Sequence, residues 1–142
     1  MRIDYGTICL REATEGDWAR LYAWRIDPTV QENAQSTGDF QIDQHMAWLR
    51  AALADPQRTR IFIAYSQVYG AVKGGAIGMG RLDHDGGDVV ALSLVIDPGV
   101  RGKGYGIHLV GALVRAAGLC FPTVPYVEAI VLATNTASLR AF

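Results

Sequence analysis

The feature that most constrains the fold is a strand-like run that leads through a glycine-rich turn into a long helix-like run. Residues Val89–Ile96 are almost all apolar, and residues 101–106 contain three glycines. Apolar residues recur at helical spacing over residues 104–119, before a second strand-like run at 126–132. Two strands joined by a crossover helix lie parallel in one sheet. The sequence therefore predicts a mixed sheet of the α/β (α+β) class.

Shorter patterns place the other elements around this unit. Helical spacing predicts one helix over residues 14–27, with Thr14 and Asp17 as a capping box, and a second over residues 43–55, with Asp43 as its cap. An Asp-Pro pair ends each of them. The predicted strands are residues 8–11, 60–65, 76–82, Val89–Ile96 and 126–132. A last helix is expected from Thr136, and we expect a single domain over residues 1–142.

Composition excludes several classes of function. The chain has 13 Lys and Arg against 14 Asp and Glu, so it lacks the basic field that draws proteins to nucleic acid. Residues 1–10 lack the apolar core of a signal peptide, and no apolar run is long enough to span a membrane. The two cysteines are not spaced as metal ligands. We therefore expect a cytoplasmic protein without a metal, a membrane or a nucleic-acid partner.

The glycine-rich turn carries the clearest chemical signal. Main-chain N–H groups at a helix N-terminus are unpaired and lie at the positive end of the helix dipole, so they bind phosphate groups. Glycines allow the ligand to approach closely, and Arg101 and Lys103 add positive charge. The turn is neither a Walker loop nor a dinucleotide fingerprint. A helix-capping glycine turn with two solvated cations is the alternative interpretation.

The same turn resembles the acetyl-CoA pyrophosphate motif of the GCN5-related N-acetyltransferases (GNAT). That motif is Arg or Gln, two residues, Gly, one residue, then Gly or Ala, and Arg101, Gly104 and Gly106 fill its fixed positions. Residues 24–28 and 129–138 also look like this family. The resemblance implies the acyl-CoA N-acyltransferase fold. It also implies an enzyme that transfers acetyl from acetyl-CoA to a primary amine, which attacks the thioester directly.

The resemblance also implies a set of cofactor-binding residues. In this family, loop amides bind the pyrophosphate, the preceding strand pairs with the pantetheine arm, and an amide near Val95 polarises the thioester carbonyl. Carried over by motif position, the set is Leu94, Val95, Ile96, Arg101, Gly102, Lys103, Gly104, Tyr105, Gly106, Asn135 and Ser138. Asn135 also fits a helix cap, which is the alternative for that residue.

A proton must leave the attacking amine, so the site needs a base. The candidates are Asp83 and His84 at the end of one predicted strand, Ser93 on the next and Glu128 on the last. His84, Ser93 and Glu128 form the expected catalytic set together with Val95. His84 follows Asp83 in a polar Asp-Gly turn, so an exposed hairpin is the alternative for this histidine. Glu128 lies in an otherwise apolar strand, and an exposed strand edge is its alternative.

The acceptor side is expected at the two N-terminal helices, which wall it in this family. Arg25 and His45 are the expected substrate contacts. Residues 24–28 and 81–83 look most like acetyltransferases that act on nucleotide-linked amino sugars. Relatives that acetylate ribosomal-protein N-termini or aminoglycosides share much of the pattern.

The chain departs from the family after Ser138. Members continue into Tyr-x-Lys-x-Gly-Phe and two further strands, whereas this sequence stops at Phe142. We therefore expect a C-terminally truncated version of the fold, with no assignable general acid. An exposed edge at residues 126–132 would favour a homodimer. A module that binds acetyl-CoA without turnover is the alternative function, and a structural domain without a cofactor is a third.

Overall fold

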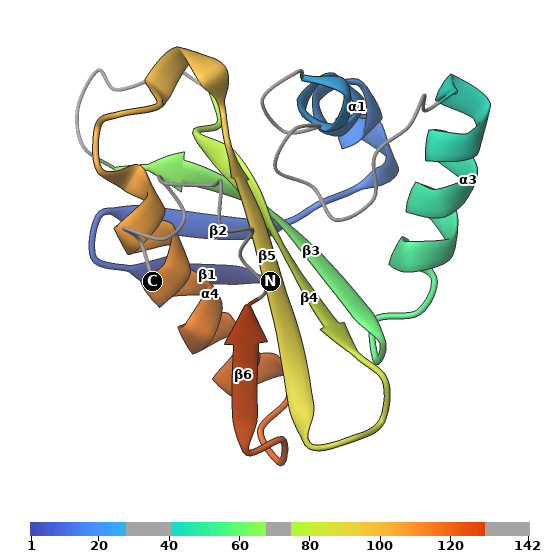
Figure 1. The fold of residues 1–142 in the computed structure, drawn as a ribbon, viewed down its shortest axis with the longest axis vertical. Helices are drawn as coiled ribbons and strands as arrows, with labels where there is room; N and C mark the ends of the chain where they lie inside the picture. Colours follow the sequence, from blue (N-terminus) through green and yellow to red (C-terminus); the bar gives the residue numbers. More distant parts are fainter. Residues whose placement is uncertain (28–40, 68–74, 130–142) are drawn as a thin grey trace.

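The computed structural model describes residues 1–27, 41–67 and 75–129, which form one mixed sheet with helices on both faces (Figure 1). The strands are β1 (Arg2–Tyr5), β2 (Ile8–Glu12), β3 (Thr59–Ser66), β4 (Gly78–His84), β5 (Val89–Ile96) and β6 (Tyr126–Ala129). The helices are η1 (Glu15–Asp17), α1 (Trp18–Ile26), α3 (Ile42–Leu53), η2 (Pro98–Val100) and α4 (Tyr105–Cys120). Within these residues the strands are ordered β1-β2-β3-β4-β5-β6 and run antiparallel, except for the parallel β5–β6 pair.

The sheet separates two cores. α4 packs on one face through Leu109 and Leu113, against Phe62 and Leu82 of the sheet. α1 and α3 cover the other face, where Leu49 packs in the second core. Alternation along β5 follows the strand period, since Val90 and Leu92 join the α4 core while Val95 packs on the α1 and α3 side. Odd-numbered positions of β5 therefore face the N-terminal helices.

The predicted fold class is confirmed, with two corrections to its elements. The chain begins with a β1–β2 hairpin rather than a single strand, and Gly6 (φ +55°) forms its turn. The sequence pattern does not indicate β1, because only Ile3 of its four residues is buried. α3 begins after Gln41, so Asp43 is not its cap but lies in its first turn, where a carboxylate still favours the helix dipole. The helix expected from Thr136 lies outside the described residues.

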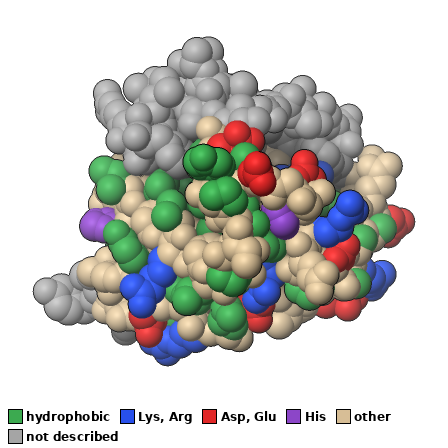
Figure 2. All heavy atoms as spheres, turned by 90° about the horizontal axis from the view of Figure 1, so that it is seen from below, with side chains coloured by type: hydrophobic (Ala, Val, Ile, Leu, Met, Phe, Trp, Pro, Cys, Tyr) green, Lys and Arg blue, Asp and Glu red, His purple; other side chains and the backbone are tan. Residues whose placement is uncertain are grey.

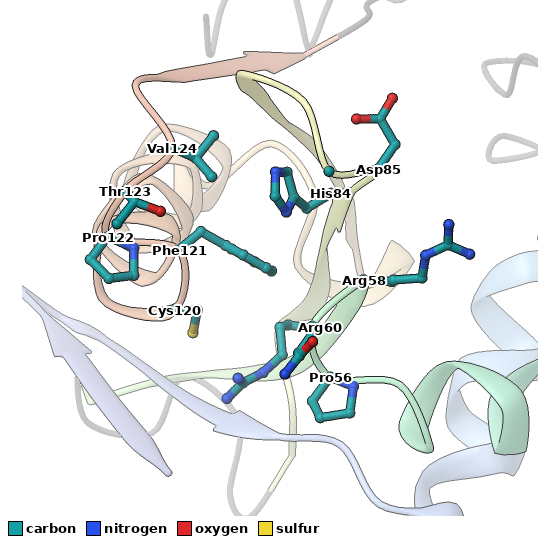
Figure 3. Close-up of a pocket in the computed structure, with 12 residues that line it drawn as sticks. Pro56, Arg58, Arg60, His84, Asp85, Cys120, Phe121, Pro122, Thr123 and Val124 are labelled. Atoms are coloured by element: carbon teal, nitrogen blue, oxygen red, sulfur yellow. The ribbon is translucent and has the colours of Figure 1, made fainter.

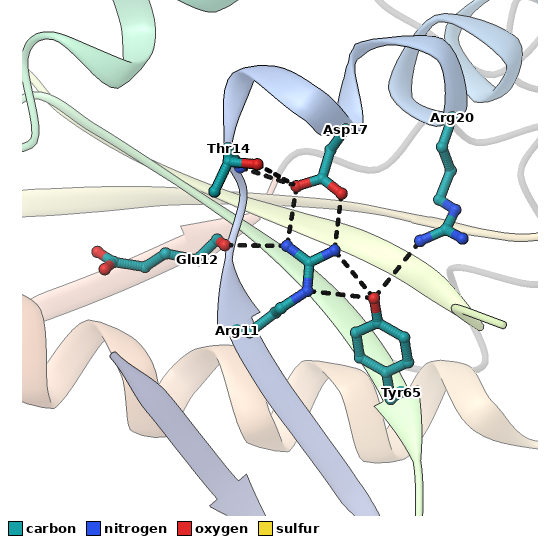
Figure 4. A network of polar contacts seen from close by, with 6 residues as sticks. All are labelled: Arg11, Glu12, Thr14, Asp17, Arg20 and Tyr65. Carbon is teal, nitrogen blue, oxygen red and sulfur yellow. Dashed lines mark hydrogen bonds and ion pairs between the residues drawn. The ribbon is translucent and has the colours of Figure 1, made fainter. Parts of the chain in front are cut away.

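A partly buried polar network joins the sheet to the start of α1 (Figure 4). Arg11 of β2 donates two hydrogen bonds to the Asp17 carboxylate, at 2.8 and 2.7 Å, and two to the Tyr65 hydroxyl. Asp17 also accepts from the Thr14 main chain, which completes the predicted capping box. The Arg11 guanidinium is the main cause of the lowered pKa of Asp17. This network fixes the direction in which the chain enters α1.

Replacing Asp17 by Asn is expected to lower the free energy of unfolding by about 2 kcal/mol at neutral pH, because Arg11 loses its charged partner. The folded-state pKa of Asp17 is depressed, so its contribution is complete above the unfolded pKa of about 3.9 and disappears as pH falls through the folded pKa. Urea unfolding at several pH values measures the difference. Asp4→Asn, which replaces a carboxylate in exposed contacts with Arg2 and Gln67, is the control and should leave stability nearly unchanged.

Candidate active site

The segment between β5 and α4 forms an open cradle of main-chain amides. Gly102 and Gly104 have φ of +81° and +83°, and Gly104 is the N-cap of α4 without a side-chain hydrogen bond. Among the described residues, no atom lies within 4 Å of a Cβ added at either glycine. The first-turn amides of α4 have no partner within the helix, and the two glycines place no side chain beside them. This arrangement fits a pyrophosphate group, as the motif predicted.

The side chains around the cradle divide into two kinds. Lys103 is exposed and can meet an anion, whereas the Arg101 guanidinium is already engaged. Its Nη2 donates to Asp27 Oδ2 and its Nε to the Ile96 carbonyl, each at 3.1 Å. The predicted pantetheine strand runs into this loop, with Leu94 and Ile96 packed toward α4 and Val95 on the opposite face. The remaining predicted cofactor residues, Asn135 and Ser138, lie outside the described residues.

A groove of about 780 Å³ opens on the α3 side of the sheet, between that helix and the β4, β5 and β6 strands. Among the described residues, five carboxylates line it, against one arginine, Arg58, and His84. The carboxylates are Asp55, Asp83, Asp85, Asp88 and Glu128. Asp83 is held in place by Arg81 Nε at 2.7 Å and Thr59 Oγ1 at 3.0 Å. The groove therefore suits a positively charged amine.

Trp48 of α3 forms part of the groove wall beside two arginines. The Arg25 guanidinium lies 4.9 Å from the centre of its indole ring, and the Arg81 guanidinium 5.9 Å. Burial, and then the charge of Arg81, lower the pKa of Arg25. Two cations beside one aromatic ring suit an anionic or aromatic part of a ligand. The predicted substrate residue Arg25 therefore lies beside the groove.

The predicted substrate residue His45 lies behind Trp48 instead. It is 1% exposed, and its ring lies 5.3 Å from that of Tyr22 and 5.5 Å from that of Trp48. Among the described residues, neither of its ring nitrogens has a partner in hydrogen-bond geometry. Burial, and then Arg25, lower its pKa, against a smaller effect of the Trp18 main chain, so the ring is neutral at pH 7. His45 supports the groove wall and does not line the groove.

The structure brings Ser93 and Glu128 of the expected catalytic set onto the same face as Val95. Ser93 is exposed on that face, about 7 Å along β5 from Val95. Glu128 is exposed on β6 opposite Ala91, about 13 Å along the strand from Val95. Both therefore lie on the acceptor side, and Glu128 also lines the groove.

His84 takes a different position. Its Nε2 lies 2.9 Å from the Gly87 carbonyl, and its ring packs 5.3 Å from that of Phe121, on the α4 side. It lines both the groove of about 780 Å³ and a second pocket of about 450 Å³, which Arg60 and the end of α4 also line (Figure 3). Its strand position, opposite Val90, is about 17 Å along β5 from Val95. The structure therefore does not bring His84 together with Val95.

Surface charge, helix length and the placement of possible metal ligands add three findings. The end of the molecule shown in Figure 2 has acidic and basic side chains interspersed, without one broad basic face. No helix among the described residues is long and apolar enough to cross a membrane. Within the same residues, no group of three or more His, Cys, Asp or Glu is placed to hold a metal ion.

Comparison with known proteins identifies the class. Residues 7–142 match the family described as the Acetyltransferase (GNAT) domain, so the chain belongs to the GNAT acetyltransferases. It is therefore an acetyl-CoA-dependent N-acetyltransferase, and structures of similar proteins have been solved with acetyl-CoA or CoA bound. No curated protein matches it in sequence.

Solved structures show the same fold at low sequence identity. Spermidine N-acetyltransferase from Vibrio cholerae, in complex with CoA and spermine, has a TM-score of 0.76 at 16% identity, covering 95% of this chain and 77% of that chain. The aminoglycoside acetyltransferase AAC(6')-Ib with coenzyme A has a TM-score of 0.70 at 23% identity, covering 94% and 80%. An acetyltransferase from Salmonella typhimurium that modifies the N-terminal serine of ribosomal protein L7/L12 has a TM-score of 0.75 at 13% identity, covering 99% and 81%.

Proposed function

We propose that this enzyme acetylates a primary amine on a small molecule in the cytoplasm, and that the acceptor is a nucleotide-linked amino sugar. The observation that carries the proposal is the division of the groove into two parts. Carboxylates such as Glu128 line the groove, whereas the Trp48 ring in its wall lies 4.9 Å from the Arg25 guanidinium and 5.9 Å from that of Arg81, which also binds Asp83. A sugar amine matches the carboxylates, and a nucleotide offers both an aromatic ring and phosphate charge for the arginines.

The chain's own residues supply binding and proton transfer. When bound, acetyl-CoA provides the thioester whose acetyl group is transferred. The amides of residues 101–106 would hold its pyrophosphate, and an amide near Val95 would polarise the thioester carbonyl. A Glu128 carboxylate oxygen would accept the proton of the amine through bound water, because it lies about 13 Å along the strand from Val95, while Ser93 Oγ offers a nearer hydrogen-bonding group on the same face.

Replacing Glu128 by Gln is expected to lower kcat at least ~100-fold while leaving the affinity for acetyl-CoA unchanged, because Gln cannot accept the proton. Release of the CoA thiol measures turnover, and calorimetry measures binding. Asp43→Asn removes an exposed carboxylate from the first turn of α3 and should keep wild-type turnover. Wild-type kcat in the Glu128 variant would assign proton removal to another group.

Acceptor class is tested with a panel of a nucleotide-linked amino sugar, an aminoglycoside, spermidine and an N-terminal peptide. The proposal requires the highest kcat/KM for the nucleotide-linked amino sugar. Preference for the aminoglycoside or the peptide would favour the alternatives that the sequence raised. Binding of acetyl-CoA without CoA release for any acceptor would instead favour a module without turnover.

A homodimer through β6 belongs to the same proposal. β6 is the edge strand of the sheet among the described residues, and Tyr126 and Val127 are 64% and 40% exposed. An apolar edge of this kind supports pairing with a second copy.

A further inference from the structure

The end of α1 is fastened to the loop that precedes the amide cradle. Trp24 Nε1 donates a hydrogen bond to Asp97 Oδ2 at 2.8 Å, across 73 positions of sequence. The other carboxylate oxygen of Asp97 accepts from the Gly99 amide at 2.8 Å and caps η2. Trp24 is only 4% exposed, so its indole N–H is removed from water and depends on this partner.

A second bridge lies beside the first. The Arg101 guanidinium donates to Asp27 Oδ2 and to the Ile96 carbonyl, and both side chains of the ion pair are partly buried, at 30% and 17% exposure. Four residues, Trp24, Asp27, Asp97 and Arg101, thus connect one helical turn to the β5–α4 loop. We call them the α1 latch.

The β5–α4 loop needs such a support because its glycines allow the backbone many conformations. Gly102 and Gly104 both have positive φ, and glycine loses more conformational freedom on ordering than any other residue. No side chain caps α4. The latch holds the residues just before these glycines in place. The loop therefore loses less conformational entropy when a ligand binds its amides.

We propose that Trp24 and Asp27 are positioning residues for the pyrophosphate cradle, and that the Arg101 side chain acts by shaping this loop rather than by touching phosphate. The inference rests on the cofactor site at residues 101–106. The motif suggests a free cation at Arg101. In the structure its guanidinium instead donates hydrogen bonds to Asp27 and to the Ile96 carbonyl, so it is not directed at a phosphate group.

The two roles for Arg101 predict changes of opposite sign. If its guanidinium binds phosphate, Asp27→Asn removes a competing carboxylate and acetyl-CoA binds more tightly. If the latch positions the loop, Asp27→Asn loosens it, and we expect the Kd for acetyl-CoA to rise about tenfold. Trp24→Phe keeps an aromatic ring in the core but removes the N–H donor, and the same rise is expected.

Calorimetry on the full chain tests this with two ligands, acetyl-CoA and S-acetylpantetheine, which lacks the pyrophosphate. A weaker affinity for acetyl-CoA with unchanged affinity for S-acetylpantetheine supports the latch. The matched control is Glu15→Gln, which breaks an exposed ion pair with Arg50 and should leave both affinities unchanged. Asp27→Glu, which restores the carboxylate, should recover part of the loss.

Three results would overturn the proposal. Tighter binding of acetyl-CoA by Asp27→Asn would make Arg101 a phosphate ligand. Equal weakening of both ligands would reduce Asp27 to a general structural role, and an unchanged Kd would give the latch no role in binding. Absence of acetyl-CoA binding by the wild-type chain would remove the cofactor site itself, which is distinct from these three results.

Discussion

Gly104→Asp should raise the Kd for acetyl-CoA at least ~100-fold. Gly104 has φ +83° and caps α4, so any side chain there is strained and projects into the open cradle. A carboxylate adds negative charge where the pyrophosphate would lie, and like charges at an interface cost several kcal/mol, equivalent to a factor of about 100 or more. Calorimetric titration with acetyl-CoA measures the change.

Gly6→Asp is the matched control for this substitution. Gly6 also has positive φ, +55°, and a Cβ added there would meet only open space, but it lies in the β1–β2 turn. Its stability cost should therefore be similar while acetyl-CoA binding is unchanged. Equal losses of affinity in the two variants would trace the effect to stability, and retained affinity in Gly104→Asp would place the pyrophosphate elsewhere.

Local patterns were sufficient to predict the unit that carries the cofactor motif. Val89–Ile96 forms β5 with the predicted bounds, because apolar β-branched residues end at an Asp-Pro pair. α4 begins one residue after the predicted start, at Tyr105, because Gly104 takes the left-handed conformation of its N-cap. Periodicity and turn chemistry act over a few residues, so one sequence contains them in full.

Tertiary contacts account for what the sequence did not show. Asp27 meets Arg101 across 74 positions, and no local pattern indicates that pairing. Residues 24–28 resembled the family, yet the hydrogen bond of Trp24 to Asp97 became visible only in the fold. Likewise, the sequence places His84 near a turn but does not show on which face of the sheet its side chain lies. In the fold, its ring packs against that of Phe121.

The groove likewise has features that the sequence indicates and features that only the fold shows. Glu128 was recognised as unusual within an apolar strand, and the structure places it on the exposed edge. Its companions Asp55, Asp83 and Asp88 come from three different parts of the chain. Each carboxylate alone resembles an ordinary polar turn residue. Whether they gather on one face of the sheet depends on the register of β4 with β5, which the sequence does not determine.

Gly78→Ala is expected to lower the free energy of unfolding by about 3 kcal/mol, the second large effect. A Cβ at Gly78 would fall inside van der Waals contact of the Val95 carbonyl oxygen and 3.2 Å from the Ile96 Cα. Both are main-chain atoms, so no rotamer change can relieve the overlap. β4 and β5 must separate beside Val95, and acetyl-CoA affinity should fall together with stability. Urea unfolding and calorimetry measure the two quantities.

Gly118→Ala is the matched control for Gly78→Ala, because it should change the free energy of unfolding in the opposite direction. Gly118 lies in α4, is exposed, and has no atom within 4 Å of an added Cβ. The same substitution should there raise the free energy of unfolding by about 0.5–1 kcal/mol, because alanine favours a helix. Wild-type stability in Gly78→Ala would show that β4 and β5 do not approach this closely in solution. Lower stability with unchanged acetyl-CoA affinity would separate the Val95 strand from cofactor binding.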